Sequence, residues 1–138
     1  VQSVGRTYNL PYLITRTCNN FGDNQHNEKF LPTIYNSIKK NKSIPIYGDG
    51  SQVREWIWVE DNVKEIYNLM LNSTGIHHIG SRDRWENKEL IQLIANILEK
   101  KVKFKFVKDR LGHDKKYALE SDNIITKSIT DYLREKYG

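Results

Sequence analysis

Three polar clusters in this 138-residue sequence combine residue types that bind anionic and polar ligands. Asn19 and Asn20 are adjacent, and their amides can donate hydrogen bonds to a neutral ligand and accept them from it. Arg54 follows a Gly-Asp-Gly turn and can hold a phosphate through two parallel hydrogen bonds. The segment 109–113, Asp-Arg-Leu-Gly-His, adds a second guanidinium. Together, the two arginines and the paired amides predict a cleft for a diphosphate joined to a sugar.

Each cluster alone also has a structural interpretation. An asparagine can cap a helix, an arginine can lie on the surface, and the segment 109–113 can be a plain loop. The prediction of a ligand cleft therefore depends on the three clusters acting together, on loops between regular elements, where binding groups are usually placed.

Several patterns that look catalytic are better explained otherwise. The segment 48–50, Gly-Asp-Gly, lacks the third glycine of a dinucleotide-binding fingerprint and is interpreted as a tight turn. Tyr35-x-x-x-Lys39 and Tyr132-x-x-x-Lys136 have the spacing of a tyrosine made basic by a lysine. Because the chain is rich in both residue types, we interpret these two pairs as ordinary helix surface.

Metal and disulfide chemistry are not expected. His77 and His78 are adjacent, so on a strand they face opposite sides and cannot share one ion. The single cysteine, Cys18, cannot form an internal disulfide, which favours a reducing, cytoplasmic location.

The elements that position these residues follow from hydrophobic periodicity. Strands are expected at 12–15, 45–47, 56–59, 76–79 and 102–106, and helices at 1–8, 32–40, 61–71, 87–100 and 126–137. The polar segments 18–27 and 108–116 are expected to be loops. This alternation predicts an α/β fold.

Composition limits the possible partners. The formal net charge is +5, which favours anionic partners. The densest lysine clusters, 39–42 and 100–103, lie at expected helix ends, where lysine complements the helix dipole, so no nucleic-acid partner is expected. No apolar run approaches the ~20 residues of a membrane span, so no membrane partner is expected either. The chain starts at Val1 rather than Met, and residues 1–8 resemble the tail of a helix whose start is missing, which suggests a fragment.

Five motifs resemble those of dTDP-glucose 4,6-dehydratases, which are extended short-chain dehydrogenases of the NAD-dependent epimerase/dehydratase family. They are TRTCNNFG (15–22), EKFLP (28–32), PIYGDG (45–50), REW with VED (54–56 and 59–61) and DRLGHD (109–114). The resemblance runs along essentially the whole chain, and in combination the motifs are specific.

The resemblance implies the C-terminal portion of such an enzyme. Residues 1–22 would be the trailing end of a Rossmann-type domain, with its last strands, and residues 23–138 would be mainly the small α/β substrate-binding domain. The family's glycine-rich loop and its catalytic tyrosine and lysine belong before Val1. NAD would be bound mainly by that missing part, no catalytic residue is expected here, and the full-length protein is expected to be a homodimer.

The resemblance also implies site residues. Asn20 would face the nicotinamide of NAD. Arg54 and Arg110 would clamp the diphosphate, and Pro45 with its two successors would surround the thymine. The complete set implied to bind substrate is Asn19, Lys29, Phe30, Pro45, Ile46, Tyr47, Arg54, Asn87, Asp109, Arg110, Leu111, Gly112 and His113.

The implied function is the nucleotide-sugar-binding part of an NAD-dependent lyase of deoxysugar biosynthesis, which converts dTDP-glucose to dTDP-4-keto-6-deoxyglucose and water. The chain alone is expected to be inactive. One alternative is a relative of UDP-sugar 4-epimerases or decarboxylases, against which Asn19-Asn20 and the DRLGHD segment argue. Another is a non-catalytic module for anionic ligands, which only the alternating aromatic and basic residues at 104–106 support.

Overall fold

Helices and strands alternate along the computed structural model, which describes residues 1–109, 111–112, 114–119 and 122–138. The helices are α1 (Gln2–Tyr8), α2 (Phe30–Lys39), α3 (Val59–Asn72), α4 (Asn87–Ile97) and α5 (Ile129–Tyr137). The strands are β1 (Leu13–Thr17), β2 (Asn19–Phe21), β3 (Ile44–Tyr47), β4 (Val53–Trp58), β5 (Gly75–Gly80), β6 (Arg84–Glu86), β7 (Phe104–Val107), β8 (Lys116–Tyr117) and β9 (Asp122–Asn123). The α/β class predicted from the sequence is confirmed. Within these described ranges, every helix is too short or too polar to span a bilayer.

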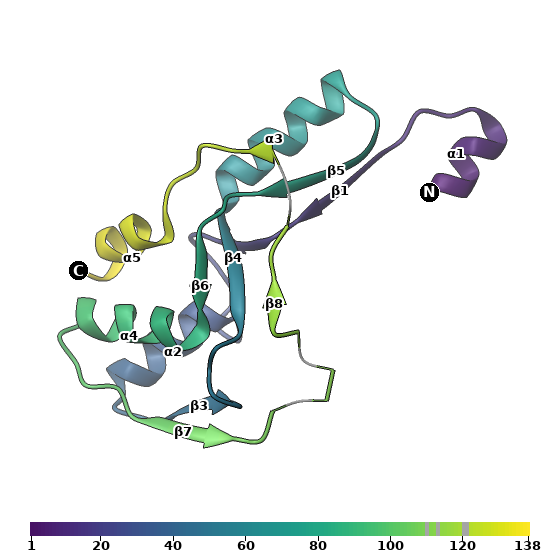
Figure 1. The fold of residues 1–138 in the computed structure, drawn as a ribbon. Coiled ribbons are helices and arrows are strands. Elements are labelled where there is room, and N and C mark those ends of the chain that lie inside the picture. Colours follow the sequence, from purple (N-terminus) through teal and green to yellow (C-terminus); the bar gives the residue numbers. More distant parts are fainter. Residues whose placement is uncertain (110, 113, 120–121) are drawn as a thin grey trace.

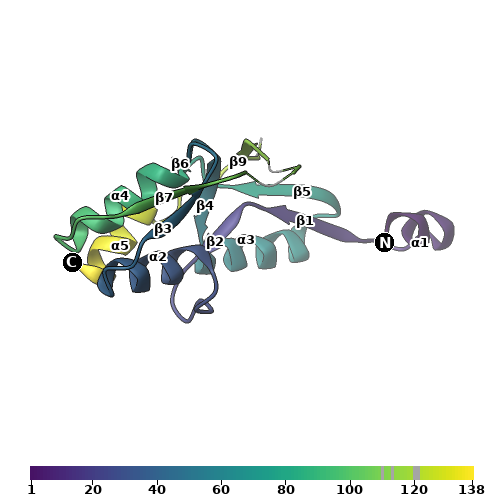
Figure 2. The same ribbon diagram turned by 90° about the horizontal axis from the view of Figure 1, so that it is seen from below.

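The described strands form small, mainly parallel sheets around β4. One sheet has the order β1-β5-β9, and a second has the order β2-β4-β6 with β8 also paired to β4. β3 and β7 form a separate parallel pair. In Figure 1, β4 runs between α3, β1 and β5 on one side and α2, α4, β3 and β7 on the other. Figure 2 shows that α1 stands at the opposite end of the molecule from α4 and α5.

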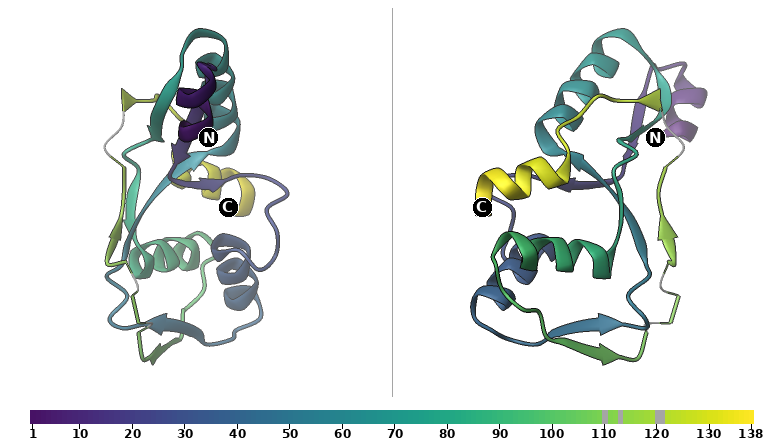
Figure 3. Two further views of the ribbon diagram at one scale, coloured as in Figure 1. Left: turned by 90° about the vertical axis from the view of Figure 1, so that its right-hand side faces the viewer. Right: turned by 60° about the vertical axis from the view of Figure 1, so that its left-hand side comes forward.

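The larger hydrophobic core lies between α2, α4, α5 and the sheets. Leu90, Ile91, Ile94 and Ala95 form the buried face of α4, with i, i+4 spacing. The views in Figure 3 place α4 beside α2, between the β3-β7 pair and α5. This packing holds the N-terminal ends of α2 and α4 next to β3 and β4.

A smaller core joins the two main sheets. Cys18, Ile57 and Ile79 are buried together, with Ile66 and Leu69 of α3 packed against them. Burial raises the pKa of the Cys18 thiol to about 12, and the nearby Glu55 carboxylate adds to the effect. The thiol therefore stays protonated at neutral pH and behaves as a small apolar side chain.

The expected loop at 18–27 contains a strand instead. β2 pairs in parallel with β4, and Phe21 is almost completely buried. Asparagine is depleted in strands, so the local sequence does not indicate β2. The strand forms because β4 supplies hydrogen-bond partners for its backbone. The last helix begins at Ile129, later than expected, because Ser128 Oγ accepts a hydrogen bond from Asp131 N at 3.1 Å and caps the helix.

Tyr132 corrects the interpretation of the second Tyr-x-x-x-Lys pair as helix surface. The residue is only 5% exposed, and its hydroxyl donates to the carbonyl oxygen of Gly22 at 2.9 Å. Its ring packs against Phe21 and Trp58, with centroid distances of 5.3 and 5.2 Å. The phenol thus attaches the C-terminal helix to the end of β2. At the first pair, Lys39 Nζ donates to the Tyr35 hydroxyl at 3.4 Å in an exposed position.

Replacing Tyr132 with phenylalanine is expected to lower the free energy of unfolding by about 1 kcal/mol, because the buried Gly22 carbonyl loses its donor. Chemical denaturation measures this difference. Tyr35→Phe is the matched control, since its hydroxyl bond is exposed, and should leave stability nearly unchanged. Equal effects of the two substitutions would contradict the structural role of the Tyr132 hydroxyl.

Candidate functional site

A cavity of about 670 Å³ lies where β3, β4 and the first turns of α2 and α4 meet. This volume is within the range of small-molecule and cofactor sites. The lining combines aliphatic and aromatic surface with amides and charged groups. It consists of Asn19, Asn20, Gln25, Glu28, Lys29, Phe30, Thr33, Ile34, Ser37, Ile44, Pro45, Ile46, Tyr47, Gly50, Gln52, Arg54, Trp56, Asn87 and Ile91.

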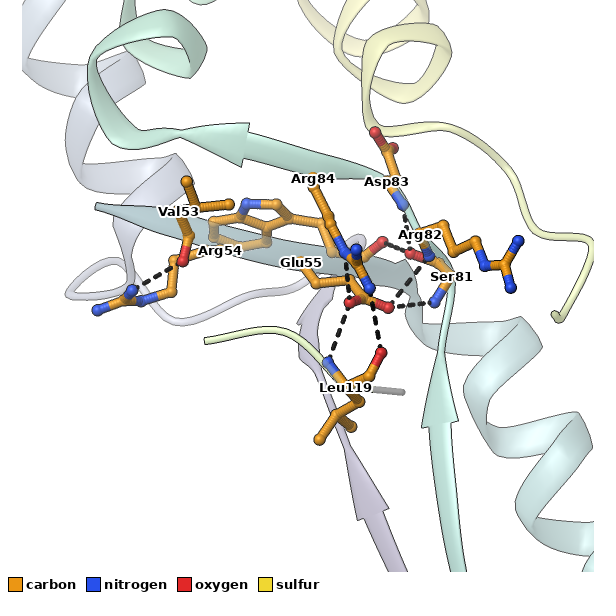
Figure 4. Close-up of polar contacts among 9 residues, drawn as sticks. Val53, Arg54, Glu55, Ser81, Arg82, Asp83, Arg84 and Leu119 are labelled. Atoms are coloured by element: carbon orange, nitrogen blue, oxygen red, sulfur yellow. Dashed lines mark hydrogen bonds and ion pairs between the residues drawn. The ribbon is translucent and has the colours of Figure 1, made fainter. Parts of the chain in front are cut away.

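β4 directs alternate side chains to opposite sides. Gln52, immediately before the strand, together with Arg54 and Trp56, lines the cavity, whereas the intervening residues do not. Figure 4 shows the Arg54 guanidinium beside the Val53 carbonyl, apart from the Glu55 carboxylate and its partners. The strand therefore contributes polar groups to the cavity at every second position.

Arg54 places a permanent positive charge at the cavity wall. Its Nη1 donates to the carbonyl oxygens of Val53 at 2.8 Å and Asp114 at 3.0 Å. Val53 N also donates to the carbonyl of Lys115 at 2.9 Å, where β8 runs beside β4. The guanidinium is thus oriented by the segment that follows the DRLGHD motif.

Glu55 holds the other side of β4 in place. Its carboxylate accepts hydrogen bonds from Ser81 N at 2.8 Å and from Arg82 N, Arg84 Nε and Leu119 N at 3.1 Å (Figure 4). The side chain is fully buried, which opposes ionisation, but these donors outweigh burial and hold the pKa below its ordinary value. This anchored carboxylate fixes the register of β4 and hence the direction of Arg54.

The Gly-Asp-Gly segment is the tight turn that the sequence predicted. Gly48 and Gly50 have φ values of 58° and 82°, a left-handed conformation that favours glycine. A Cβ at Gly48 would lie 3.1 Å from Asp109 Oδ2, so glycine also lets the 109 segment approach. Gln52 Nε2 joins the two sides, donating to the carbonyl oxygen of Tyr47 at 2.9 Å and to Asp109 Oδ2 at 3.1 Å.

The first turns of two helices complete the wall. Phe30 begins α2, and its ring lies 5.9 Å from that of Trp56. Asn87 begins α4, where its backbone N donates to the carbonyl of Gln52 at 3.0 Å. These contacts seat both helix N-termini against β4.

The paired asparagines occupy β2. Asn19 lies beside Trp56 in the parallel pairing of β2 with β4. The Asn20 amide is bound within the chain: Nδ2 donates to the carbonyl of Cys18 at 3.1 Å, and Oδ1 accepts from Asn62 Nδ2 at 2.8 Å. The contact of Asn20 with a nicotinamide stays a prediction.

The cavity brings together most residues that the resemblance implied. Asp109 does not line it, but contacts Gln52, which does. Leu111 is fully exposed and Gly112 has open space around it, so the structure places neither in the cavity. Arg110 and His113 lie outside the described residues. The predicted residues in the lining are Asn19, Asn20, Lys29, Phe30, Pro45, Ile46, Tyr47, Arg54 and Asn87.

Several lining residues were not predicted from the sequence, and two of them, Gln52 and Trp56, flank Arg54. The signal was available, because both are separated from Arg54 by one residue in a strand and so share its face. His77, on β5, bonds through Nε2 to Ser73 Oγ at 2.8 Å, away from the cavity lining. In the described part of the chain, no group of three or more His, Cys, Asp or Glu side chains could hold a metal ion.

A family model described as the NAD dependent epimerase/dehydratase family matches residues 1–80. The chain is 42% identical over 125 residues to the low-salt glycan biosynthesis protein Agl12 of Haloferax volcanii, covering 88% of this chain and 40% of that protein. It is 38% identical over 139 residues to the dTDP-glucose 4,6-dehydratase of Haemophilus influenzae, covering 90% of this chain and 41% of that protein.

Solved structures extend this similarity. DesIV, a dTDP-glucose 4,6-dehydratase from Streptomyces venezuelae with NAD bound, aligns with a TM-score of 0.88 at 33% identity. The alignment covers 97% of this chain and 45% of that one. The chain therefore spans less than half the length of each of these similar proteins.

Proposed function

Because the chain belongs to the NAD-dependent epimerase/dehydratase family, we propose that it is the nucleotide-sugar-binding part of a dTDP-glucose 4,6-dehydratase. The observation that carries this proposal is the cavity in which Arg54, the paired asparagines of β2 and the 45–47 segment meet. The cation suits a diphosphate, the neutral amides suit a sugar, and the apolar walls suit a base.

Each part of the cavity has a binding role. The 45–47 segment and Phe30 would surround the thymine, Arg54 would neutralise the diphosphate, and Asn19 would hold the sugar. Arg110 and His113 are proposed to act with Arg54, on the resemblance of their motif. These groups bind and orient the substrate, and none of the described cavity residues is assigned the proton transfers.

NAD would supply a hydride acceptor and donor, and would be held mainly by a part of the full-length protein outside this chain. The described residues offer it little: Asn20 lines the cavity, but its amide already bonds to Cys18 and Asn62. We accordingly assign residues 1–22 to the end of a nucleotide-binding domain and residues 23–138 mainly to the substrate domain. The pairing of β5 with β1 supports a return of the chain to the first domain.

Calorimetric titration of the folded chain tests the proposal. We expect dTDP to bind and UDP to bind more weakly, and we expect no keto-sugar product from dTDP-glucose and NAD, since the NAD fingerprint is absent from the sequence. Preference for UDP would favour the epimerase or decarboxylase alternative. Steeply salt-dependent DNA binding without nucleotide binding would instead support a non-catalytic anion-binding module.

A further inference from the structure

Two polar atoms in the cavity wall have no hydrogen-bond partner in the part of the chain that the structure describes. They are Gln52 Oε1, an acceptor, and Trp56 Nε1, a donor. Each residue is only 4% exposed, and each lines the cavity. Buried polar groups are nearly always paired, so two unpaired atoms on one wall point to a ligand that completes them.

The orientation of the Gln52 amide follows from its partners. Its Nε2 lies 2.9 Å from the carbonyl oxygen of Tyr47 and 3.1 Å from the carboxylate of Asp109. Both partners are acceptors, so the nitrogen must face them and the oxygen must point elsewhere. The amide of Gln52, a residue of the cavity wall, therefore has an unpaired acceptor and no unpaired donor.

The order of the groups along β4 matches the order of the parts of a nucleotide sugar. Gln52 bonds to Tyr47 just before β4 begins, and Trp56 pairs with Asn19 four residues further along the chain. Arg54 stands between them on the same face. Successive positions on this face are about 6.8 Å apart, so the groups are spread along the cavity.

We propose that this face of β4 recognises a nucleotide sugar in three parts: Gln52 Oε1 accepts a hydrogen from the nucleoside, Arg54 binds the diphosphate, and Trp56 Nε1 donates to a sugar oxygen. The proposal rests on the proposed function. Phosphate oxygens carry no hydrogen when ionised and would be repelled by Gln52 Oε1, which excludes the diphosphate as its partner. The distance of Gln52 from Asn19 along the strand then assigns this acceptor to an N–H or O–H of the nucleoside rather than to the sugar.

Titration with three ligands tests each assignment. Pyrophosphate lacks the nucleoside, dTDP lacks the sugar, and dTDP-glucose has all three parts. Gln52→Met, which keeps the side-chain length, should weaken dTDP binding about threefold to tenfold and leave pyrophosphate binding unchanged. Trp56→Phe should weaken the binding of dTDP-glucose by a similar factor. This loss is measured relative to the binding of dTDP by the same variant, so that any effect of repacking on both ligands cancels.

Two further ligands identify the nucleoside donor. If the imide N–H of the base is the donor, N3-methyl-dTDP should bind the wild-type chain more weakly than dTDP does. In Gln52→Met, the loss of affinity caused by the methyl group should be smaller. If the 3′-hydroxyl of the deoxyribose is the donor, 3′-deoxythymidine diphosphate should show this pattern instead. Gln92→Met, at an exposed position of α4 outside the cavity, is the matched control.

The proposal is overturned if Gln52→Met weakens pyrophosphate as much as dTDP, or if Trp56→Phe leaves the ratio of dTDP-glucose to dTDP affinity unchanged. It also fails if neither nucleoside analogue shows the expected pattern. If circular dichroism shows that the wild-type chain is folded but the chain binds no nucleotide, both the proposed function and this inference are wrong. Nucleotide binding by the wild type with no effect of either substitution rejects this inference alone.

Discussion

Replacing Arg54 with alanine is expected to weaken dTDP binding by about tenfold to a hundredfold, since hydrogen bonds to charged groups contribute about 1.5–3 kcal/mol. The guanidinium lines the cavity and is oriented by the carbonyl oxygens of Val53 and Asp114. Alanine removes the charge and both anchoring contacts. Calorimetric titration of the variant against the wild type measures the loss.

Arg54→Lys separates charge from geometry. Lysine keeps the positive charge but cannot form two parallel bonds to one phosphate, so an intermediate affinity is expected. Arg134→Ala removes the same charge from an exposed position on α5 and controls for long-range attraction. If Arg134→Ala weakens dTDP binding as much as Arg54→Ala, the phosphate contact assigned to Arg54 is wrong.

Replacing Glu55 with glutamine is expected to lower the free energy of unfolding by about 1–3 kcal/mol, because buried donors lose a charged acceptor. The carboxylate satisfies Arg84 Nε and the backbone N–H groups of Ser81, Arg82 and Leu119. An amide presents an NH₂ group to some of these donors and leaves them unpaired. Denaturation midpoints at constant m-value measure the loss.

The same network predicts a pH dependence. Burial raises the pKa of Glu55, but its hydrogen bonds lower it more, so the folded-state pKa lies below the ordinary value of 4.5. A depressed pKa contributes stability that is complete above the unfolded-state value and is lost as pH falls through the folded-state value. The stability difference between the wild type and Glu55→Gln should therefore shrink below about pH 4.5.

Two substitutions check the Glu55 interpretation. Glu55→Asp keeps the charge, so most of the lost stability should return. Glu135→Gln breaks an exposed ion pair with Lys127 and should cost less than about 1 kcal/mol. A Glu55→Gln variant as stable as Glu135→Gln would show that the buried network contributes little.

The sequence predicts the long periodic elements of the fold well. The apolar stripe of α4 identifies that helix, because it buries one continuous face, and the alternation at 102–106 indicates the strand β7. β2, β6 and β8 are two or three residues long, too short to show a period, and exist because β4 pairs with them. Tyr132 was misjudged because the partner of its hydroxyl, Gly22, is distant in sequence.

The cavity is predicted in part for similar reasons. The resemblance supplies Asn19, Arg54 and Asn87 from motif positions, and all three line it. Gln52 has no motif role, and its importance emerges only when Tyr47 and Asp109 are seen to hold its amide nitrogen. Side-chain orientation of this kind depends on contacts between distant segments, which spacing alone does not reveal.

The bond between Tyr132 and Gly22 links positions 110 residues apart, which has a consequence for how the chain is made. During synthesis, β2 and β4 emerge long before α5, which packs against β4 and α4. Until α5 emerges from the ribosome, the apolar surface that it covers stays open to chaperones and to other nascent chains. Such non-local closure slows folding, so a late refolding phase sensitive to Tyr132→Phe should accompany docking of α5.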